Sequence, residues 1–478
     1  MDFNLDKASM HTLSFRGTLA DNIRDDTANL AQFPGQEAAS KILENHRGIS
    51  ARYTAVLTPS IVNVFTYGLT RLGSETSGVR GASITFTPST FTAFPRAITR
   101  IQPTHNFVND TTWTKRAHTV QFGINFRVTT NDRVQDNNYP SYSYGRNTLK
   151  GLGADINGSV LDFLKQRTGN SALTLSEGTL ATNAFGTMYG IVNSYSGTYN
   201  YNVDGSANSF GTPVIRSFAN KEYEAYVQDA WKVRPDLNIT LGLRYGVYQV
   251  PYERNGVQVA TTTGIDRYFA ERVGASMAGI PGNATQNAFL TFALAGPTRG
   301  GQGFYKQDNN NFAPRVSIAW APQDSTFASK ILGKGAVLRA GGAMVYDRYG
   351  SSMATSFAAS GSPGLATTVT QPSNTDFTDS YRYTGGGLPA LPAAAQGGFP
   401  FTPPAVAGGF GSYSGVNSNL VAPYSMLLNF SYTRPLPGKM TVEMGYIGRL
   451  SRKGILRQDY FQPLTQFRDA KSGMRSDQ

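Results

Sequence analysis

Residues 220–250 alternate between apolar and polar side chains over two successive runs. In the second run, the apolar side chains at every other position are Leu237, Ile239, Leu241, Leu243, Tyr245 and Val247. In the first run they are Tyr223, Ala225, Val227, Trp231 and Val233, and only Asp229 interrupts the apolar side. This period of two indicates β-strands with one apolar face. Arg234-Pro235-Asp236 supplies a turn, so we expect a β-hairpin whose strands are long enough to cross an apolar membrane layer at a tilt.

Further runs in the chain alternate in the same way and bring the expected total to about eleven strands. They are His11–Leu19, Ser50–Leu57, Ile61–Leu72, His105–Trp113, His118–Thr129, Phe312–Trp320, Ala336–Tyr346, Tyr424–Thr433 and Lys439–Arg449. Each short connection joins two alternating runs, which predicts antiparallel pairing in sequence order. Short helices are expected at Gln36–Asn45, at Val160–Gln166 and around Tyr268 and Phe269, the last one capped by Asp266.

The connections alternate in length along the chain. Those at 58–60, 114–117, 234–236 and 434–438 are short, the one at 321–335 is moderate, and the ones between them are long and rich in Gly, Ser, Asn and Tyr. All the short connections would lie at one end of the sheet. This asymmetry is typical of an all-β, antiparallel transmembrane barrel of the outer membrane, with short periplasmic turns and long external loops.

The three tryptophans agree with a membrane boundary at the short-turn end. Trp113, Trp231 and Trp320 each lie near the end of a strand, before a short or moderate connection, and Tyr432 has the equivalent place in the last hairpin. Indole rings favour the interface, where the ring is buried and the N–H stays hydrated. We therefore expect one aromatic belt; Asp229 would lie at this interface or be turned inward by a β-bulge.

Composition excludes several other classes. No apolar run approaches the ~18 residues of a spanning helix, and charged residues make up only 15% of the 478 residues. The absence of cysteine excludes disulfides and thiolate sites. The net charge is +12, but lysine and arginine are spread along the chain without dense blocks. This distribution argues against nucleic acid and favours a basic surface near anionic lipid headgroups.

Two segments carry a family resemblance. Residues 226–233, of sequence YVQDAWKV, followed by 237–245, LNITLGLRY, resemble the barrel hairpin of TonB-dependent outer-membrane receptors, especially the Oar-like group. Segments 118–123, 311–316 and 337–342, with Tyr346-Asp347-Arg348, resemble further strands of that group. The similarity covers roughly His11 to Gln466. It implies outer-membrane localisation, lipid contact, an unidentified ligand at the extracellular loops and coupling to the TonB system.

The resemblance leaves several family parts without a counterpart. No signal peptide, plug domain or TonB box is visible, and the family barrel has about twice as many strands. We therefore expect residues 1–478 to form a partial barrel, an open half-barrel with long loops, and TonB to be reached only through the missing N-terminal part. The alternative is a soluble or surface β-sandwich that binds polysaccharide through its tyrosine-rich loops.

Candidate chemistry in the sequence is weak, and we expect neither an enzyme nor a cofactor. The four histidines, His11, His46, His105 and His118, are far apart and form no metal-binding pair. Residues 350–354 lack the closing glycine of a nucleophile elbow. Asp132 and Asp136, flanked by Asn131, Asn137 and Asn138, offer hard oxygen ligands for calcium but match no complete calcium loop, so a solvated polar loop is favoured.

Overall fold

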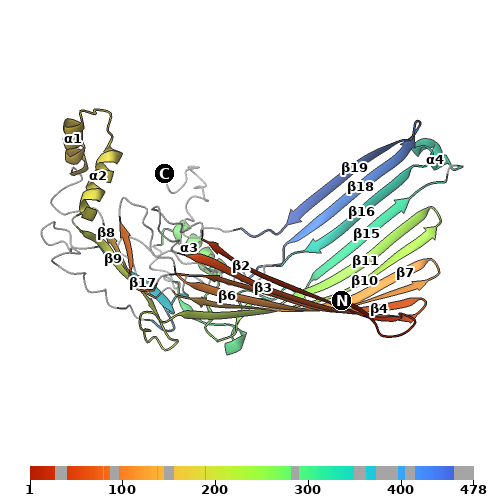
Figure 1. Ribbon diagram of the computed structural model, residues 1–478, viewed down its shortest axis with the longest axis horizontal. Helices are drawn as coiled ribbons and strands as arrows, with labels where there is room; N and C mark the ends of the chain where they lie inside the picture. The colour runs from red at the N-terminus through yellow and green to blue at the C-terminus, as the bar shows by residue number, and fades with distance from the viewer. Residues whose placement is uncertain are drawn as a thin grey trace.

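A computed structural model gives the fold of the chain. It describes residues 1–26, 40–78, 80–86, 96–136, 138–144, 156–188, 190–280, 290–323, 325–348, 362–372, 394, 397–403 and 415–456. The central element is one long, curved sheet whose strands follow each other in sequence order (Figure 1).

We call this sheet the wall. It contains all eleven predicted strands, and each is paired with its expected neighbours. Two short additions are β1 at one edge and β12, which pairs with β10. The strands are β1 (Asp2–Asn4), β2 (His11–Asp25), β3 (Lys41–Thr58), β4 (Ile61–Thr76), β6 (Ile98–Lys115), β7 (His118–Gln135), β10 (Val214–Arg234), β11 (Leu237–Tyr248), β12 (Tyr252–Glu253), β15 (Asn311–Trp320), β16 (Val337–Tyr346), β18 (Tyr424–Leu436) and β19 (Met440–Arg452). All these pairs are antiparallel.

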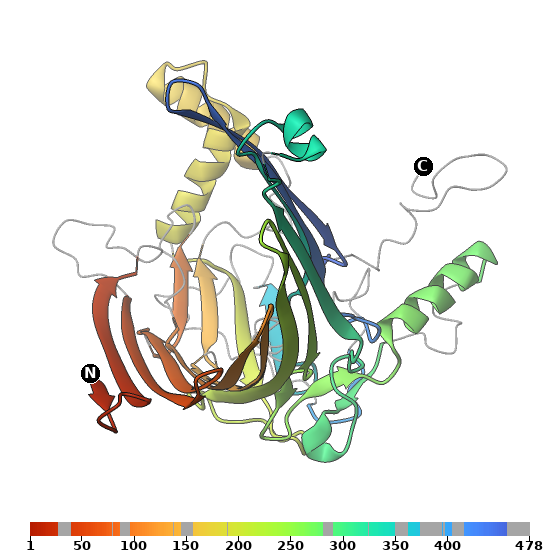
Figure 2. The same cartoon turned by 90° about the vertical axis from the view of Figure 1, so that its right-hand side faces the viewer.

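The long connections gather at the other end of the wall from the short turns, where they form structure of their own (Figures 1 and 2). A small sheet has the order β17–β9–β8–β5, and β13 pairs with β14. These elements and the helices are β5 (Ser83–Phe86), β8 (Pro140–Tyr144), α1 (Ile156–Thr168), α2 (Leu175–Met188), β9 (Val192–Asn200), β13 (Val259–Thr261), α3 (Ile265–Met277), β14 (Phe292–Leu294), η3 (Pro297–Arg299) and β17 (Ala366–Pro372). One further helix, α4 (Phe327–Leu332), lies at the short-turn end. No helix among the described residues is long and apolar enough to cross a membrane.

The predicted hairpin of β10 and β11 is confirmed in its register. Tyr223 lies opposite Val247 and Trp231 lies opposite Ile239, with one irregularity between Lys232 and Arg234 beside the turn. The two strands therefore place their apolar residues on one common face, because side chains alternate across a strand.

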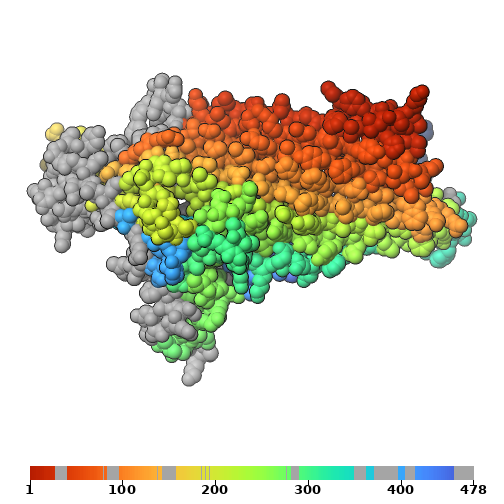
Figure 3. Space-filling view, turned by 90° about the horizontal axis from the view of Figure 1, so that it is seen from below, coloured from red at the N-terminus to blue at the C-terminus, as the bar shows by residue number. Residues whose placement is uncertain are grey.

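The apolar face of the wall is exposed along its length. On β11, 55% of Leu241 and 44% of Leu243 are accessible, and similar residues of every neighbouring strand are exposed too. Figure 3 shows successive strands side by side as a continuous surface. A β-sandwich would bury this face against a second sheet, so the sandwich alternative is wrong for the wall.

Aromatic residues border the apolar face at two levels. At the short-turn end lie the tryptophans and Tyr432, as predicted. Toward the loop end lie cross-strand aromatic pairs with ring centroids 4.7–5.6 Å apart: Phe126 with Tyr223, Tyr245 with Phe312, and Tyr346 with Tyr424. Tyr223 and Trp231, Phe312 and Trp320, and Tyr424 and Tyr432 are each eight residues apart on one strand. Eight residues span about 26 Å along a strand, or roughly 20 Å across the membrane at a tilt of about 40°, which fits within an apolar band about 25 Å tall.

Asp229 stays on the apolar face, at the tryptophan level. Its carboxylate lies 2.7 Å from Nδ1 of His118, and the His118 ring stacks on Trp231 with centroids 5.4 Å apart. The ladder from β7 to β10 is regular at this point, so no bulge turns Asp229 inward. The first of the two predicted alternatives, a position at the interface, is therefore confirmed.

Polar side chains line the other face of the wall. Glu224 accepts hydrogen bonds from Arg244 at 3.1 Å, Asn125 at 3.1 Å and Tyr248 at 3.1 Å. Glu222, two residues earlier on the same face, is bound by Arg127 at 2.9 Å and by Arg348, which follows β16. Because β11 and β15 lie between β10 and β16 in the wall, this contact crosses the hollow. The polar face is therefore the concave one, as predicted for Glu224 and Arg244.

We expect Glu222→Gln to destabilise the protein by about 1.5–3 kcal/mol, because the buried carboxylate makes charged hydrogen bonds to two guanidinium groups. The measurement is urea unfolding in native membranes. Glu443→Gln is the matched control, since Glu443 on β19 is exposed. Equal shifts of the unfolding midpoint in the two variants would contradict an ion-pair role for Glu222.

The strands are longer than predicted at their loop ends. The predicted helix Gln36–Asn45 is wrong for residues 41–45, which belong to β3 and pair with β2 and β4; residues 36–39 lie outside the described part. Above the membrane both faces of a strand are wet, so the sequence there need not alternate. The small sheet, whose strands were not predicted, contains one parallel pair, β5 with β8.

The predicted helices in the long connections are confirmed in place. Val160–Gln166 lies inside α1, and α3 contains Tyr268 and Phe269. Asp266 lies within the first turn of α3 and is not its cap; its carboxylate accepts a hydrogen bond from Asn419 at 2.9 Å. The loop end has its own apolar core around Val259, Tyr268 and Phe292.

Candidate ligand pocket at the loop end

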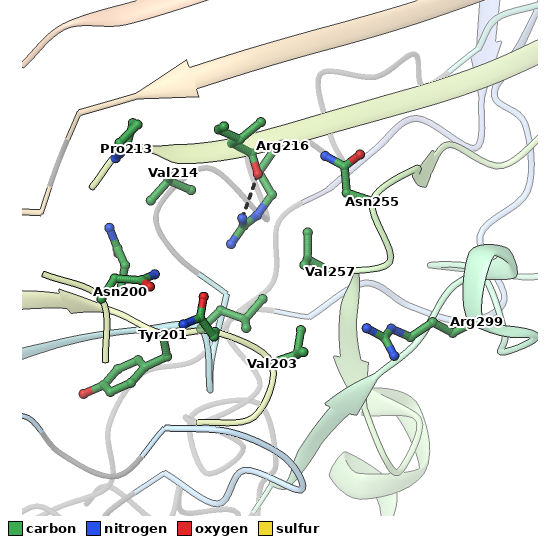
Figure 4. A pocket seen from close by; sticks show the side chains of 13 residues that line it. Asn200, Tyr201, Val203, Pro213, Val214, Arg216, Asn255, Val257 and Arg299 are labelled. Atoms are coloured by element: carbon green, nitrogen blue, oxygen red, sulfur yellow. Dashed lines mark hydrogen bonds between the residues drawn. The ribbon is translucent and has the colours of Figure 1, made fainter. Parts of the chain in front are cut away.

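A pocket of about 350 Å³ lies where the wall meets the loop end. It forms because β10 begins at Val214 and so extends beyond the last residue of its partner β11. The turn after β9 and the connection around η3 close the space beside this extension (Figure 4). The lining residues are Asn200, Tyr201, Asn202, Val203, Asn208, Pro213, Val214, Ile215, Arg216, Asn255, Val257, Arg299 and Leu365.

The turn after β9 is held by backbone hydrogen bonds at both ends. Tyr201 N–H donates to the Leu365 carbonyl at 2.9 Å, and Asn208 N–H donates to the Asn200 carbonyl at 2.7 Å. Within the turn, Gly205 has φ = 89°, a left-handed conformation that glycine adopts without strain. The turn therefore forms a fixed side of the pocket, and Asn202 and Val203 line the pocket from this turn.

Two arginines contribute the positive charge of the pocket. Arg216 lies on β10 and donates from Nη1 to the carbonyl of Ile215 at 2.9 Å, while its Nε is buried with no hydrogen-bond partner in the described part of the chain (Figure 4). Arg299, at the end of η3, donates from Nε to the Gly256 carbonyl. A buried donor without a partner is costly, so a ligand oxygen placed at Arg216 would gain a charged hydrogen bond.

Glu253 is an opposing charge that does not line the pocket. It is fully buried, and its two carboxylate oxygens accept from the backbone N–H groups of Ser217 at 3.0 Å and Val257 at 2.9 Å. Its hydrogen bonds fasten β12 to the start of β10. None of the described lining residues is acidic, whereas two of them, Arg216 and Arg299, carry guanidinium groups.

The other polar groups of the pocket are neutral donors and acceptors. Asn202, Asn208 and Asn255 carry amides that both donate and accept. Burial raises the pKa of the Tyr201 hydroxyl, against a hydrogen bond with Thr367 that lowers it, so the phenol keeps its proton and remains a donor. This set suits a small anionic ligand with several oxygen atoms.

The structure separates the carboxylates considered for calcium. Asp132 accepts from the Ser217 hydroxyl, and Asp136 lies 3.5 Å from Arg80; Asn137 lies outside the described residues. Asp132 also belongs to β7 and not to a loop. Among the described residues, no three His, Asp or Glu side chains gather in a way that would hold a metal ion.

The histidines lie apart on the strands of the wall. Nδ1 of His11 is 2.8 Å from the Tyr53 hydroxyl, and Nδ1 of His105 is 2.9 Å from the Tyr67 hydroxyl. Together with the pair of His118 and Asp229, these contacts satisfy polar groups on the outer face. His46 lies on β3, and no two histidines share a site in the described structure.

The pocket residues were missed in the sequence because they come from five separate segments. Arg216 and Arg299 lie in stretches that were predicted to be irregular loops. Residues 214–221, of sequence VIRSFANK, do not alternate between apolar and polar side chains, so the local sequence does not signal that β10 extends this far.

Solved structures of outer-membrane transporters resemble this chain at low identity. The transporter YddB from Escherichia coli is 10% identical with a TM-score of 0.40, over 92% of this chain and 37% of YddB. The ferripyoverdine receptor of Pseudomonas aeruginosa is 10% identical with a TM-score of 0.39, over 93% and 40%. The ferric-catecholate import receptor Fiu from Escherichia coli K12 is 8% identical with a TM-score of 0.37, over 92% and 49%. The chain thus spans less than half the length of each of these structures.

A comparison with curated proteins found no match. A family model described as "outer membrane beta barrel domain" matches residues 1–475, nearly the whole chain. This agrees with the exposed apolar face, its two aromatic borders and the separation of short turns from long loops. The chain belongs to the outer membrane beta barrel domain family, and its location is the outer membrane.

Proposed function

We propose that this chain is the barrel portion of a TonB-dependent receptor that captures a ligand at its extracellular loop end. The motifs of the hairpin formed by β10 and β11 support the receptor class. Outer-membrane barrels have short periplasmic turns and longer extracellular loops. The gathering of helices and small sheets at the loop end therefore lies on the extracellular side, which supports a capture role. The role is transport and not catalysis.

The observation that carries the proposal is the pocket beside the start of β10. Its lining joins the start of β10 to four other segments of the loop end, so a ligand bound there would contact both the wall and the loops. Arg216 and Arg299, with the surrounding amides, select for anionic oxygen, such as the carboxylates of an organic acid. Energy coupling would enter through a plug and a TonB-contacting segment that lie outside residues 1–478.

We expect Arg216→Ala to weaken binding of a small polycarboxylate by roughly 10- to 100-fold, the value of one or two charged hydrogen bonds. The probe is citrate, titrated calorimetrically into the protein in native outer-membrane vesicles. Arg299→Ala should have a similar effect. Arg216→Lys should retain part of the affinity, because it keeps the charge and loses the planar fork of donors.

The control is Arg167→Ala, which removes an exposed arginine from α1 at the same end of the molecule. It should leave citrate binding unchanged, and glucose should not bind to any variant. If citrate binds equally well without Arg216 and Arg299, the pocket is not the capture site.

A further inference from the structure

The short helix α4, between β15 and β16, exposes an apolar pair. Phe327 is 77% accessible and Ile331 is 69% accessible, and they lie one turn apart on the same face. The helix is well defined, since the Thr326 side chain accepts from Ser329 N–H at its start and Gly333 N–H donates to the Ser329 carbonyl at its end. The fixed helix thus holds two large apolar side chains together as a small exposed patch that a partner surface can cover.

The contacts of α4 place it on the outer side of the wall. Tyr432 belongs to the exposed apolar stripe of β18, and its hydroxyl donates to the Leu332 carbonyl. Arg434 follows on the same face and lies against Gly333. The helix therefore lies beyond the tryptophan level, at the tips of the short turns (Figures 1 and 2).

Cations surround the apolar pair. Lys330 and Lys334 flank it on its own segment, and Arg434 and Lys439 are exposed on the next hairpin. The neighbouring turns add the exposed side chains of Lys115, Arg116, Lys232 and Arg234. The described carboxylates near these tips are fewer than the cations: Asp6 lies in the turn before β2, and Glu443 is exposed on β19. Asp236 pairs with Arg234 at 3.5 Å and accepts from Trp320 Nε1 at 3.3 Å. The band is therefore strongly positive.

We propose that α4 is an interfacial anchor in the periplasmic leaflet of the outer membrane. Phe327 and Ile331 enter the boundary between headgroups and acyl chains, and the lysines bind the phosphate groups of phospholipids. Charge complementarity and continuity with the lipid-facing wall identify the occupant as the phospholipid surface. Apolar side chains flanked by lysine and arginine are the pattern by which interfacial helices bind anionic lipid.

The test uses the absence of cysteine from the chain. Phe327→Cys is introduced into the complete receptor that contains this chain, with any cysteine outside residues 1–478 replaced by serine. It is labelled with bimane in native outer-membrane vesicles, and its fluorescence is quenched with doxyl-stearic acid from the lipid or iodide from water. Phe163→Cys is the matched control, because Phe163 is 58% accessible on α1 at the opposite end. Doxyl-stearic acid should quench the label at 327 more strongly than the label at 163, and iodide should show the reverse order.

A second arm tests the charges. Lys330→Gln with Lys334→Gln, in the Phe327→Cys protein, should reduce the quenching by doxyl-stearic acid and increase that by iodide. Iodide quenching at 327 equal to that at 163 would overturn the anchor. Protection at 327 from both quenchers would also overturn it, in favour of a protein partner. Unchanged quenching in the lysine variant would refute the contact with phosphate.

Discussion

Replacing Leu241 and Leu243 together by arginine is expected to keep the protein from assembling in the outer membrane. Both side chains lie on the exposed apolar face of β11, between Tyr245 at the upper aromatic border and Trp320, which lies opposite Leu237 at the lower one. An arginine near the bilayer midplane costs about 2–4 kcal/mol in a transmembrane barrel. The two changes together would cost about 4–8 kcal/mol, comparable to the whole stability of many domains.

The variants are made in the complete receptor that contains this chain, and the measurement is the amount of receptor in the outer-membrane fraction and its urea unfolding midpoint there. The matched control is Asn238→Arg with Thr240→Arg, on the same strand but on the concave polar face. This control should assemble nearly normally, because an arginine there meets water and polar neighbours. Equal assembly of the two double variants would show that the apolar face of β11 does not contact lipid.

The wall could be predicted from the sequence because lipid on one side imposes a strict pattern. On β11, every second residue from Leu237 to Val247 is apolar, and this fixes both the strand and its face. The extension of β3 over residues 41–49 could not be predicted, because polar surroundings on both faces leave no alternation. These extensions become visible only in the strand pairing of the structure, where Arg24 of β2 lies opposite Ile42 of β3.

The pocket and α4 could not be predicted for different reasons. The pocket depends on pairings between distant segments; β17 pairs with β9, for example, placing Ala366 opposite Asn200. The helix α4 has only six residues, too few to show a helical period. Its apolar residues Phe327 and Ile331 are exposed. The usual rule that large apolar side chains lie in the interior would therefore predict the wrong position for them.

The largest expected effect concerns the two edges of the wall. Beyond β18, β19 has no strand partner among the described residues, and β1 covers only residues 12–14 of β2. In lipid, each backbone N–H or C=O group left without a partner costs several kcal/mol. Both edges therefore require partner strands wherever the wall crosses the apolar layer.

The directions of the edge strands oppose closure of the wall on itself. Eleven long strands alternate from β2 to β19, so β2 and β19 both run from the short-turn end to the loop end. Pairing them would create a parallel seam, whereas single-chain bacterial outer-membrane barrels have even numbers of antiparallel strands. An antiparallel partner strand from outside the described wall is the arrangement that satisfies each edge.

We therefore expect cells that produce residues 1–478, and no other part of a receptor, to take up no ligand by an energy-dependent route and to accumulate the chain as aggregate. Uptake is measured in cells that lack the corresponding receptor. A scan of cysteine pairs between β2 and β19, in a chain that has no other cysteine, reports directly on the seam. Disulfides between the two strands, together with energy-dependent uptake, would show that the wall closes on itself as a smaller complete barrel.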